Sequence, residues 1–136
     1  AASDVYKRQT ETGPISIVLR AEDAMRKLGS TGKPAIHCEV RLVDEQGNDV
    51  PRGTVGEIWV RGLNLMQGYW RDPDNPSFQQ GWFRTGDLAR IDEEGFWYVA
   101  GRSKDMIISG GENVYPAELE NILVDCPDIA EAAVFG

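Results

Sequence analysis

Residues 82–105, WFRTGDLARIDEEGFWYVAGRSKD, are the stretch that decides the fold. The stretch contains two short runs rich in apolar and aromatic residues, 88–91 and 96–100, which are typical of β-strands. The residues between these runs, Asp92-Glu93-Glu94-Gly95, are ones that tight turns favour. This part of the chain therefore predicts an antiparallel hairpin.

A second hairpin is predicted upstream. Apolar and polar residues roughly alternate through residues 36–43, turn-forming residues fill 44–48, and the apolar pattern resumes at 56–61. Residues 68–81 contain two prolines and two glycines and predict a loop. We therefore expect residues 36–100 to be mostly antiparallel β-structure.

The pattern changes after Gly101. Residues 106–108 predict a short strand, Pro116 marks the start of a helix, and Pro127 marks its end. Residues 129–135 predict a further strand. The predicted helix carries one apolar face, at positions i, i+3, i+4 and i+7, which consists of Leu119, Ile122, Leu123 and Cys126.

The predicted fold class is α+β. We expect a mostly antiparallel, β-barrel-like subdomain over residues 10–102, which begins with a strand at 15–19 and one or two helical turns in 21–28. Residues 103–136 are then the start of a small α+β domain. Both ends of the sequence read as interruptions of a longer protein.

Composition excludes several classes of function. The chain has 136 residues, 41% of them hydrophobic, and a formal net charge of −8. This charge argues against a nucleic-acid partner, because duplex affinity comes mainly from Lys and Arg that neutralise phosphates. No stretch approaches the ~18 consecutive apolar residues of a transmembrane segment. Cys38 and Cys126 form neither a metal-type pair nor a disulfide framework, which favours a reducing compartment and a cytoplasmic location.

Residues 1–9, AASDVYKRQ, have the sequence expected from a transposase adapter of DNA sequencing libraries read as protein. We therefore expect this segment to be foreign to the fold. The alternative is a flexible polar N-terminus.

Four motifs occur in a telling order: TETG at 10–13, GEI at 56–58 with MQGY at 66–69, WFRTGD at 82–87, and GRSKD at 101–105 followed by Gly110, Asn113 and PAELE at 116–120. In this order and spacing they resemble the adenylate-forming superfamily, most closely its acyl-CoA synthetase branch. The segment ISGGENVYP at 108–116 is more similar to fatty-acyl and aryl-acid CoA ligases than to peptide-synthetase adenylation domains.

This resemblance implies a two-step reaction. A carboxylate attacks the α-phosphate of ATP to give an acyl-adenylate and pyrophosphate, and the thiol of coenzyme A then displaces AMP. The implied cofactors and partners are ATP or AMP, Mg²⁺, coenzyme A and a small-molecule carboxylic acid. The resemblance implies nothing about the oligomeric state.

The resemblance also assigns residues to the nucleotide. Glu11 matches the position that ligates Mg²⁺, and the neighbouring Thr10 hydroxyl suits the α-phosphate. Asp87 matches the aspartate that holds the ribose. A carboxylate suits this role because its two oxygens can accept from two vicinal hydroxyls at once. Arg102 is the second ribose or phosphate contact. Taken alone, each of these residues also fits a turn or an exposed loop.

Two further positions are implied by the same resemblance. Lys104 corresponds to the hinge between the large domain and the small mobile domain. The loop Ser109-Gly110-Gly111 suits close passage of the pantetheine arm of coenzyme A, since a Cβ there would obstruct it. A plain β-turn is the competing interpretation of these glycines.

The chain contains no residue that matches the catalytic position of this family, since the catalytic lysine is expected beyond Gly136 and the phosphate-binding loop upstream of Thr10. We therefore expect the 136 residues alone to form no acyl-adenylate. Three alternatives stay open: a fatty-acyl-AMP ligase or carrier-loading adenylation domain, a non-catalytic nucleotide-binding module, and a β-rich interaction domain with accidental motif matches.

Overall fold

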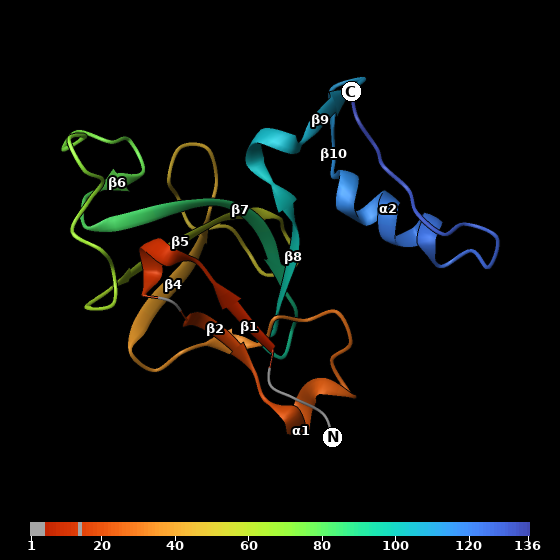
Figure 1. The fold of residues 1–136 in the computed structure, drawn as a ribbon, viewed down its shortest axis with the longest axis horizontal. Coiled ribbons are helices and arrows are strands. Elements are labelled where there is room, and N and C mark those ends of the chain that lie inside the picture. The colour runs from red at the N-terminus through yellow and green to blue at the C-terminus, as the bar shows by residue number, and fades with distance from the viewer. Residues whose placement is uncertain (1–4, 14) are drawn as a thin grey trace.

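The computed structural model describes residues 5–13 and 15–136 of the chain, with side chains from residue 9 onward (Figure 1). The strands are β1 (Val5–Arg8), β2 (Ile15–Leu19), β3 (Lys33–Pro34), β4 (Cys38–Val43), β5 (Gly56–Gly62), β6 (Phe78–Gln79), β7 (Trp82–Ile91), β8 (Trp97–Arg102), β9 (Ile107–Ser109) and β10 (Glu112–Val114). The helices are α1 (Ala21–Ala24) and α2 (Pro116–Val124), and the 3₁₀ turns are η1 (Thr10–Thr12) and η2 (Ser103–Asp105).

The main element is a five-stranded antiparallel sheet. Its order is β4-β5-β7-β6, and β8 pairs with β7. The β4–β5 pair runs in continuous register from Cys38 opposite Gly62 to Val43 opposite Glu57, and β7–β8 pairs across the turn at residues 92–95. Both predicted hairpins are therefore confirmed. The predicted loop at 68–81 contains one short strand, β6.

A three-stranded sheet, β1-β2-β3, lies against this main sheet (Figure 1). The two are joined where Thr31 N–H donates to the Trp97 carbonyl and Trp97 N–H donates to the Gly32 carbonyl, both at 2.8 Å. Among the described strands, however, β4 forms no ladder with β6 or β8 at the other side of the main sheet. The mostly antiparallel β-structure is thus confirmed, and the barrel-like closure is wrong.

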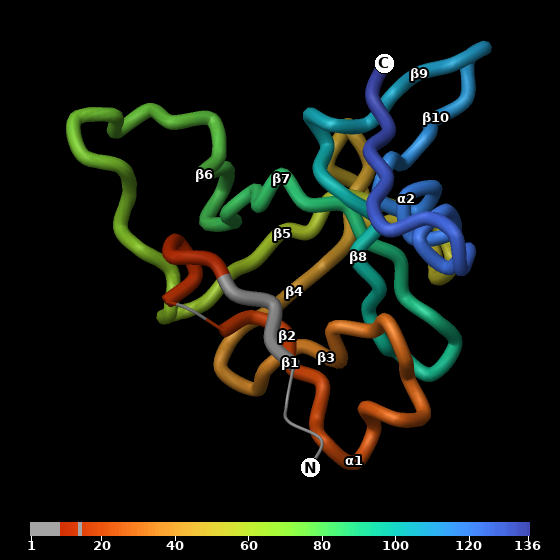
Figure 2. The backbone as a smooth tube through the Cα atoms, turned by 45° about the vertical axis from the view of Figure 1, so that its right-hand side comes forward, coloured from red at the N-terminus to blue at the C-terminus, as the bar shows by residue number. Residues whose placement is uncertain are grey.

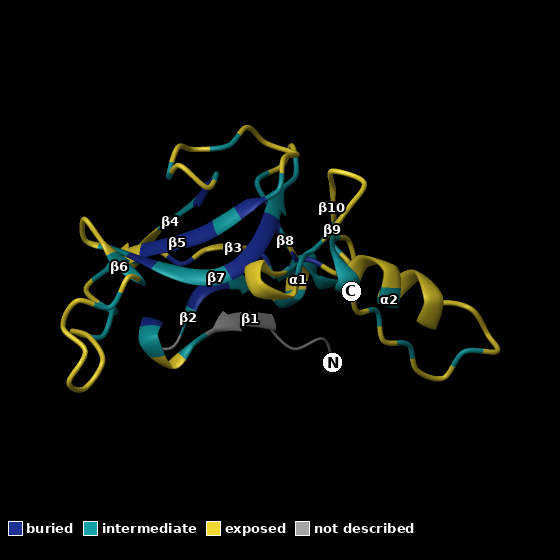
Figure 3. Ribbon diagram, turned by 90° about the horizontal axis from the view of Figure 1, so that it is seen from above, coloured by how far each residue is buried: buried dark blue, intermediate teal, exposed yellow. Residues whose placement is uncertain are grey.

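The hydrophobic core lies between β2 and the main sheet, where the buried segments of β5, β7 and β8 meet (Figure 3). Full burial of an Ile, Leu or Val side chain contributes about 1.5–3 kcal/mol. The core cluster consists of Ile17, Leu42, Ile58, Val60, Ala89 and Trp97.

The C-terminal elements project beyond the main sheet (Figures 1 and 2). Strands β9 and β10 form a two-stranded hairpin, and α2 begins at Pro116 as predicted but ends at Val124, before Cys126. No residue of α2 is buried, and all four residues of the predicted apolar face are exposed: Leu119, Ile122, Leu123 and Cys126.

The strand predicted at residues 129–135 is wrong. Among the described residues no strand pairs with this segment, and an extended apolar run becomes a strand only when a neighbour completes its hydrogen bonds. Within the described ranges, no helix has the length and apolar character needed to cross a membrane.

Candidate functional site

The candidate site is built on a bulge in β7. Across the β5–β7 ladder Glu57 lies opposite Leu88 and Trp59 opposite Arg84, so residues 85–87 share a single opposing residue, Ile58. Gly86 has φ of +73°, a left-handed conformation that glycine adopts without a Cβ penalty. A bulge of this kind re-aims the side chains of its strand.

The pairing of β7 with β8 places Asp87 and Arg102 side by side. They are register partners across β7 and β8, and the Arg102 Nε lies 3.5 Å from the Asp87 Oδ1. The Asp87 side chain is 8% exposed, whereas that of Arg102 is 60% exposed. A carboxylate held in place beside a largely free guanidinium is suited to a polar, hydroxyl-bearing or anionic ligand.

Gln9 covers the second oxygen of this carboxylate. Its Nε2 donates to the Asp87 Oδ2 at 2.8 Å and to the Thr85 carbonyl at 3.3 Å. A ligand that takes both oxygens of Asp87 therefore has to share Oδ2 with the Gln9 amide or displace it. That residues 1–9 are foreign to the fold stays a prediction, although β1 and Gln9 take part in the described structure.

A hollow of about 430 Å³ opens beside the bulge. Glu11, Gly86, Arg102 and Lys104 are among the residues that line it. Thr10 lies on the same 3₁₀ turn as Glu11 and is exposed. The predicted metal position Glu11, the nucleotide position Arg102 and the hinge position Lys104, separated by up to 93 residues in sequence, thus line one hollow beside the middle of β7. Thr10 and Asp87 are not among the residues that line it.

The loop that follows β5 fixes the turn that carries Glu11. Met66 N–H donates to the Glu11 carbonyl at 2.9 Å, and the Tyr69 hydroxyl donates to the Glu11 Oε1 at 3.0 Å. Asn64 Nδ2 donates to the Thr12 carbonyl at 2.6 Å. Partial burial and the hydrogen bond to the Glu11 carboxylate both raise the pKa of Tyr69. The loop therefore orients the Glu11 carboxylate through both its backbone and its side chain.

Tyr69 was not predicted as a site residue. Its ring packs edge-on against Phe78 at 6.1 Å, so the hydroxyl is supported from the main sheet. The available sequence signal was its place at the end of the MQGY motif, which gave no indication of its partner.

Glu57 was also not predicted. Its carboxylate is 12% exposed and accepts from four donors, which are Gly86 N, Trp59 Nε1 and the Nε and Nη2 of Arg84, at 3.0–3.1 Å. The available sequence signal was its place in the GEI motif at 56–58, but its donors become visible only once β5 and β7 are placed in register.

The predicted coenzyme A loop lies apart from this hollow. Ser109 ends β9, Gly110 and Gly111 form the exposed turn to β10, and neither glycine would bring an added Cβ within 4 Å of another atom. None of the three lines the 430 Å³ hollow.

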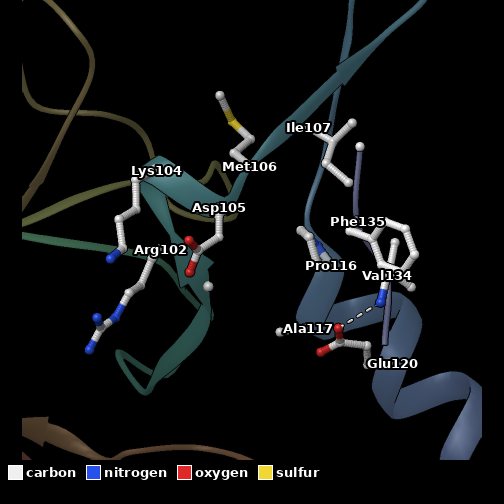
Figure 4. Close-up of a pocket in the computed structure, with 12 residues that line it drawn as sticks. Arg102, Lys104, Asp105, Met106, Ile107, Pro116, Ala117, Glu120, Val134 and Phe135 are labelled. Atoms are coloured by element: carbon white, nitrogen blue, oxygen red, sulfur yellow. Dashed lines mark hydrogen bonds between the residues drawn. The ribbon is translucent and has the colours of Figure 1, made fainter. Parts of the chain in front are cut away.

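Lys104 also borders a larger hollow of about 630 Å³, between η2 and the C-terminal elements (Figure 4). On the side of this hollow away from η2, Glu120 of α2 holds the C-terminal segment, since its Oε1 accepts from the Val134 N–H at 2.9 Å (Figure 4). The predicted hinge position therefore lies between the two hollows.

In the described part of the chain, no three His, Cys, Asp or Glu residues gather closely enough to hold a metal ion by themselves. Glu11 supplies a single carboxylate at the edge of the hollow. This donor set fits Mg²⁺ shared with substrate phosphates, which commonly takes only one or two protein carboxylates. It does not fit a structural metal centre.

Comparison with known proteins identifies relatives of this chain. Residues 9–70 match the family described as AMP-binding enzyme. The chain is 54% identical over 129 residues to the indoleacetate–CoA ligase of Aromatoleum aromaticum, covering 93% of this chain and 25% of that protein. The 2-succinylbenzoate–CoA ligase of Bacillus velezensis is 49% identical, with 93% and 26% covered.

The fold has solved counterparts. The O-succinylbenzoate coenzyme A synthetase from Bacillus subtilis, in complex with AMP, matches with a TM-score of 0.89 and 44% identity over 98% of this chain and 28% of that one. The chain spans about a quarter of the length of the curated relatives that it matches. By its motifs, its relatives and its fold, the chain is similar over nearly its whole length to AMP-binding, adenylate-forming enzymes of the acyl-CoA synthetase branch.

Proposed function

We propose that this chain supplies the ribose-binding and metal-binding residues of an ATP-dependent acid–thiol ligase. In the first step a carboxylate oxygen bonds to the α-phosphorus of ATP and pyrophosphate leaves. In the second step the sulfur of coenzyme A bonds to the acyl carbon and AMP leaves. The observation that carries the proposal is that Glu11, Arg102 and Lys104 line one hollow, and that Arg102 pairs there with the Asp87 carboxylate.

The roles follow from the chemistry of each side chain. Asp87 presents two acceptor oxygens to the two ribose hydroxyls, and Arg102 supplies donors to the ribose or the phosphate. Thr10 donates to the α-phosphate from the turn that carries Glu11. Mg²⁺, when bound, neutralises charge on the phosphates, and Glu11 is the residue of this chain that would hold it.

Lys104 lies where the backbone leaves the main sheet through η2, and we assign it the hinge position. The domain division at residues 102 and 103 stays a prediction with it. The turn at residues 109–111 is the proposed pantetheine contact, which requires it to approach the hollow by rotation about that hinge. A cytoplasmic location also stays a prediction.

Several relatives have names that point to aromatic acids, namely indoleacetate, 2-succinylbenzoate and feruloyl substrates. These names favour an aromatic carboxylic acid as the substrate of the protein that contains this chain. An amide bond synthetase from Marinactinospora thermotolerans has the same local fold, with a TM-score of 0.85 and 39% identity. For this reason the acceptor of the second step needs its own test.

The proposal is tested in a hybrid protein. In it, residues 10–136 of this chain replace the matching segment of the Bacillus subtilis 2-succinylbenzoate–CoA ligase, which is 46% identical over 129 residues. We expect ATP–pyrophosphate exchange that depends on 2-succinylbenzoate, and thioester formation when coenzyme A is added. A folded hybrid without exchange contradicts the proposal. Exchange without thioester formation refutes only coenzyme A as the acceptor.

A Tyr69→Phe variant of the hybrid tests the metal role of Glu11. The ring and its contact with Phe78 stay, and only the hydroxyl that orients the Glu11 carboxylate is lost. We expect the Mg²⁺ concentration for half-maximal pyrophosphate exchange to rise about 3- to 10-fold, since a hydrogen bond to a charged group contributes about 1 kcal/mol or more. The matched control is Tyr98→Phe, which removes a hydroxyl 3.4 Å from Asp92, at the opposite end of the β7–β8 hairpin. Equal Mg²⁺ requirements in all three proteins would argue against this role.

A further inference from the structure

The bulge in β7 leaves backbone groups that the β5–β7 ladder cannot pair. An unpaired polar group in a half-buried sheet is unfavourable by about 1–3 kcal/mol. Side chains replace the missing bonds: the Thr85 hydroxyl donates to the Ile58 carbonyl at 2.9 Å, and Gly86 N–H donates to the Glu57 Oε1 at 3.1 Å. Thr85 Oγ1 also accepts from Asp87 N–H at 3.1 Å.

Glu57 is itself held from the other side. Its Oε2 accepts from Trp59 Nε1 at 3.0 Å and from the Arg84 Nε and Nη2 at 3.1 and 3.0 Å. Trp59 is buried, so the indole is a fixed donor. The Oε2 of Glu57 is thereby held by Trp59 and Arg84, while its Oε1 accepts from the Gly86 N–H of the bulge.

The arrangement requires a carboxylate. Four donors converge on the two oxygens of Glu57, and an ionised carboxylate accepts on both. A glutamine has one acceptor oxygen and would point an N–H₂ group at either Gly86 N–H or the Arg84 donors. One orientation loses the hydrogen bond from Gly86 N–H, and the other loses the hydrogen bonds from Arg84.

We infer that Glu57 is a positioning residue for the ribose grip: it sets the Gly86 peptide, and through it the direction in which Asp87 meets its ligand. This inference rests on the proposed function, and it adds Glu57, with Trp59 and Arg84 behind it, to the residues that determine ribose recognition. Glu57 also lines the 430 Å³ hollow, and the inference assigns its effect to the position of Asp87 and not to a contact of its own with the ribose.

The experiment measures ribose discrimination, which is the dissociation constant of 2′,3′-dideoxy-AMP divided by that of AMP, in the hybrid protein. In the unaltered hybrid we expect a ratio of about 100, because two hydroxyls bond to one carboxylate. In Glu57→Gln the ratio falls about 10-fold or more, while the affinity for dideoxy-AMP stays within about 3-fold. A loss of stability alone would not produce this selective loss.

The matched control is Glu39→Gln, the same substitution on the neighbouring strand β4. Glu39 pairs with Arg61 at 2.6 Å on the exposed side of the sheet, and its loss leaves the ratio unchanged. A wild-type ratio in Glu57→Gln, together with a lost ratio in Asp87→Asn, overturns the inference. An unaltered hybrid that does not discriminate between the two nucleotides refutes the proposed role of Asp87 instead.

A second variant keeps the inference testable if Glu57→Gln does not fold. Trp59→Phe retains a buried ring and removes one of the donors that anchor Glu57. We expect its ratio to fall several-fold. A wild-type ratio in Trp59→Phe, combined with unfolding of Glu57→Gln, assigns Glu57 to stability and overturns the inference.

Discussion

An Asp87→Ala variant of the hybrid protein is expected to bind AMP at least about 100-fold more weakly than the unaltered hybrid. Hydrogen bonds to a charged group contribute about 1.5–3 kcal/mol each, and Asp87 can accept from both ribose hydroxyls. Two bonds at the low end of that range correspond to about 3 kcal/mol, which is about a factor of 100 in affinity. Calorimetric titration with AMP measures this loss directly.

The fold should tolerate this change. Arg102, the ion-pair partner of Asp87, is 60% exposed and becomes solvated by water when the carboxylate is removed. The matched control is Asp74→Ala, which removes an exposed carboxylate from the loop between β5 and β6. If Asp87→Ala binds AMP as tightly as Asp74→Ala does, Asp87 does not hold the ribose.

The hairpins could be predicted because their signals are local. Turn-forming residues at 44–48 and 92–95, each flanked by strand-like runs, were enough to place β4–β5 and the central part of β7–β8. The full extent of β7 was not predicted, because Gly86 interrupts its pattern with a left-handed backbone. That interruption is the bulge that carries the candidate site.

The supports of the site could not be predicted from local sequence. Glu57 meets Gly86, and Tyr69 meets Glu11, across 29 and 58 residues of chain. A Glu on an alternating strand and a Tyr at the end of a loop motif give no indication of such partners. By contrast, Asp87 and Arg102 were predicted through the resemblance, which records their type and order but not their contacts.

The C-terminal segment shows the opposite case, in which a strong local pattern led to a wrong prediction. Residues 129–135 have the apolar run of a strand, yet in the described structure Val134 N–H donates to Glu120 of α2 and no strand pairs with the segment. A strand depends on a partner, and periodicity carries no information about whether a partner is present.

A Gly32→Ala substitution is expected to destabilise the chain by about 4 kcal/mol or more, an effect on stability that few single changes reach. An added Cβ at Gly32 would lie 1.9 Å from the Val18 carbonyl oxygen and 2.3 Å from the Leu19 nitrogen, both of them backbone atoms of β2. The φ of +100° adds strain for any residue with a side chain. Relief of the clash would require Gly32 to move away from β2.

Such a movement would also break the junction between the two sheets, because the Gly32 carbonyl accepts from Trp97 N–H of β8. Urea-induced unfolding followed by tryptophan fluorescence compares this variant with Gly29→Ala. Gly29 has a similar left-handed φ of +77° but nothing within 4 Å of its added Cβ, so the control isolates the backbone strain, which costs about 1 kcal/mol. The difference between the two variants therefore measures the clash with β2. Equal, small losses in both would mean that the 30–32 loop is not pressed against β2, and that the junction of the sheets depends on the hydrogen bonds to Trp97 alone.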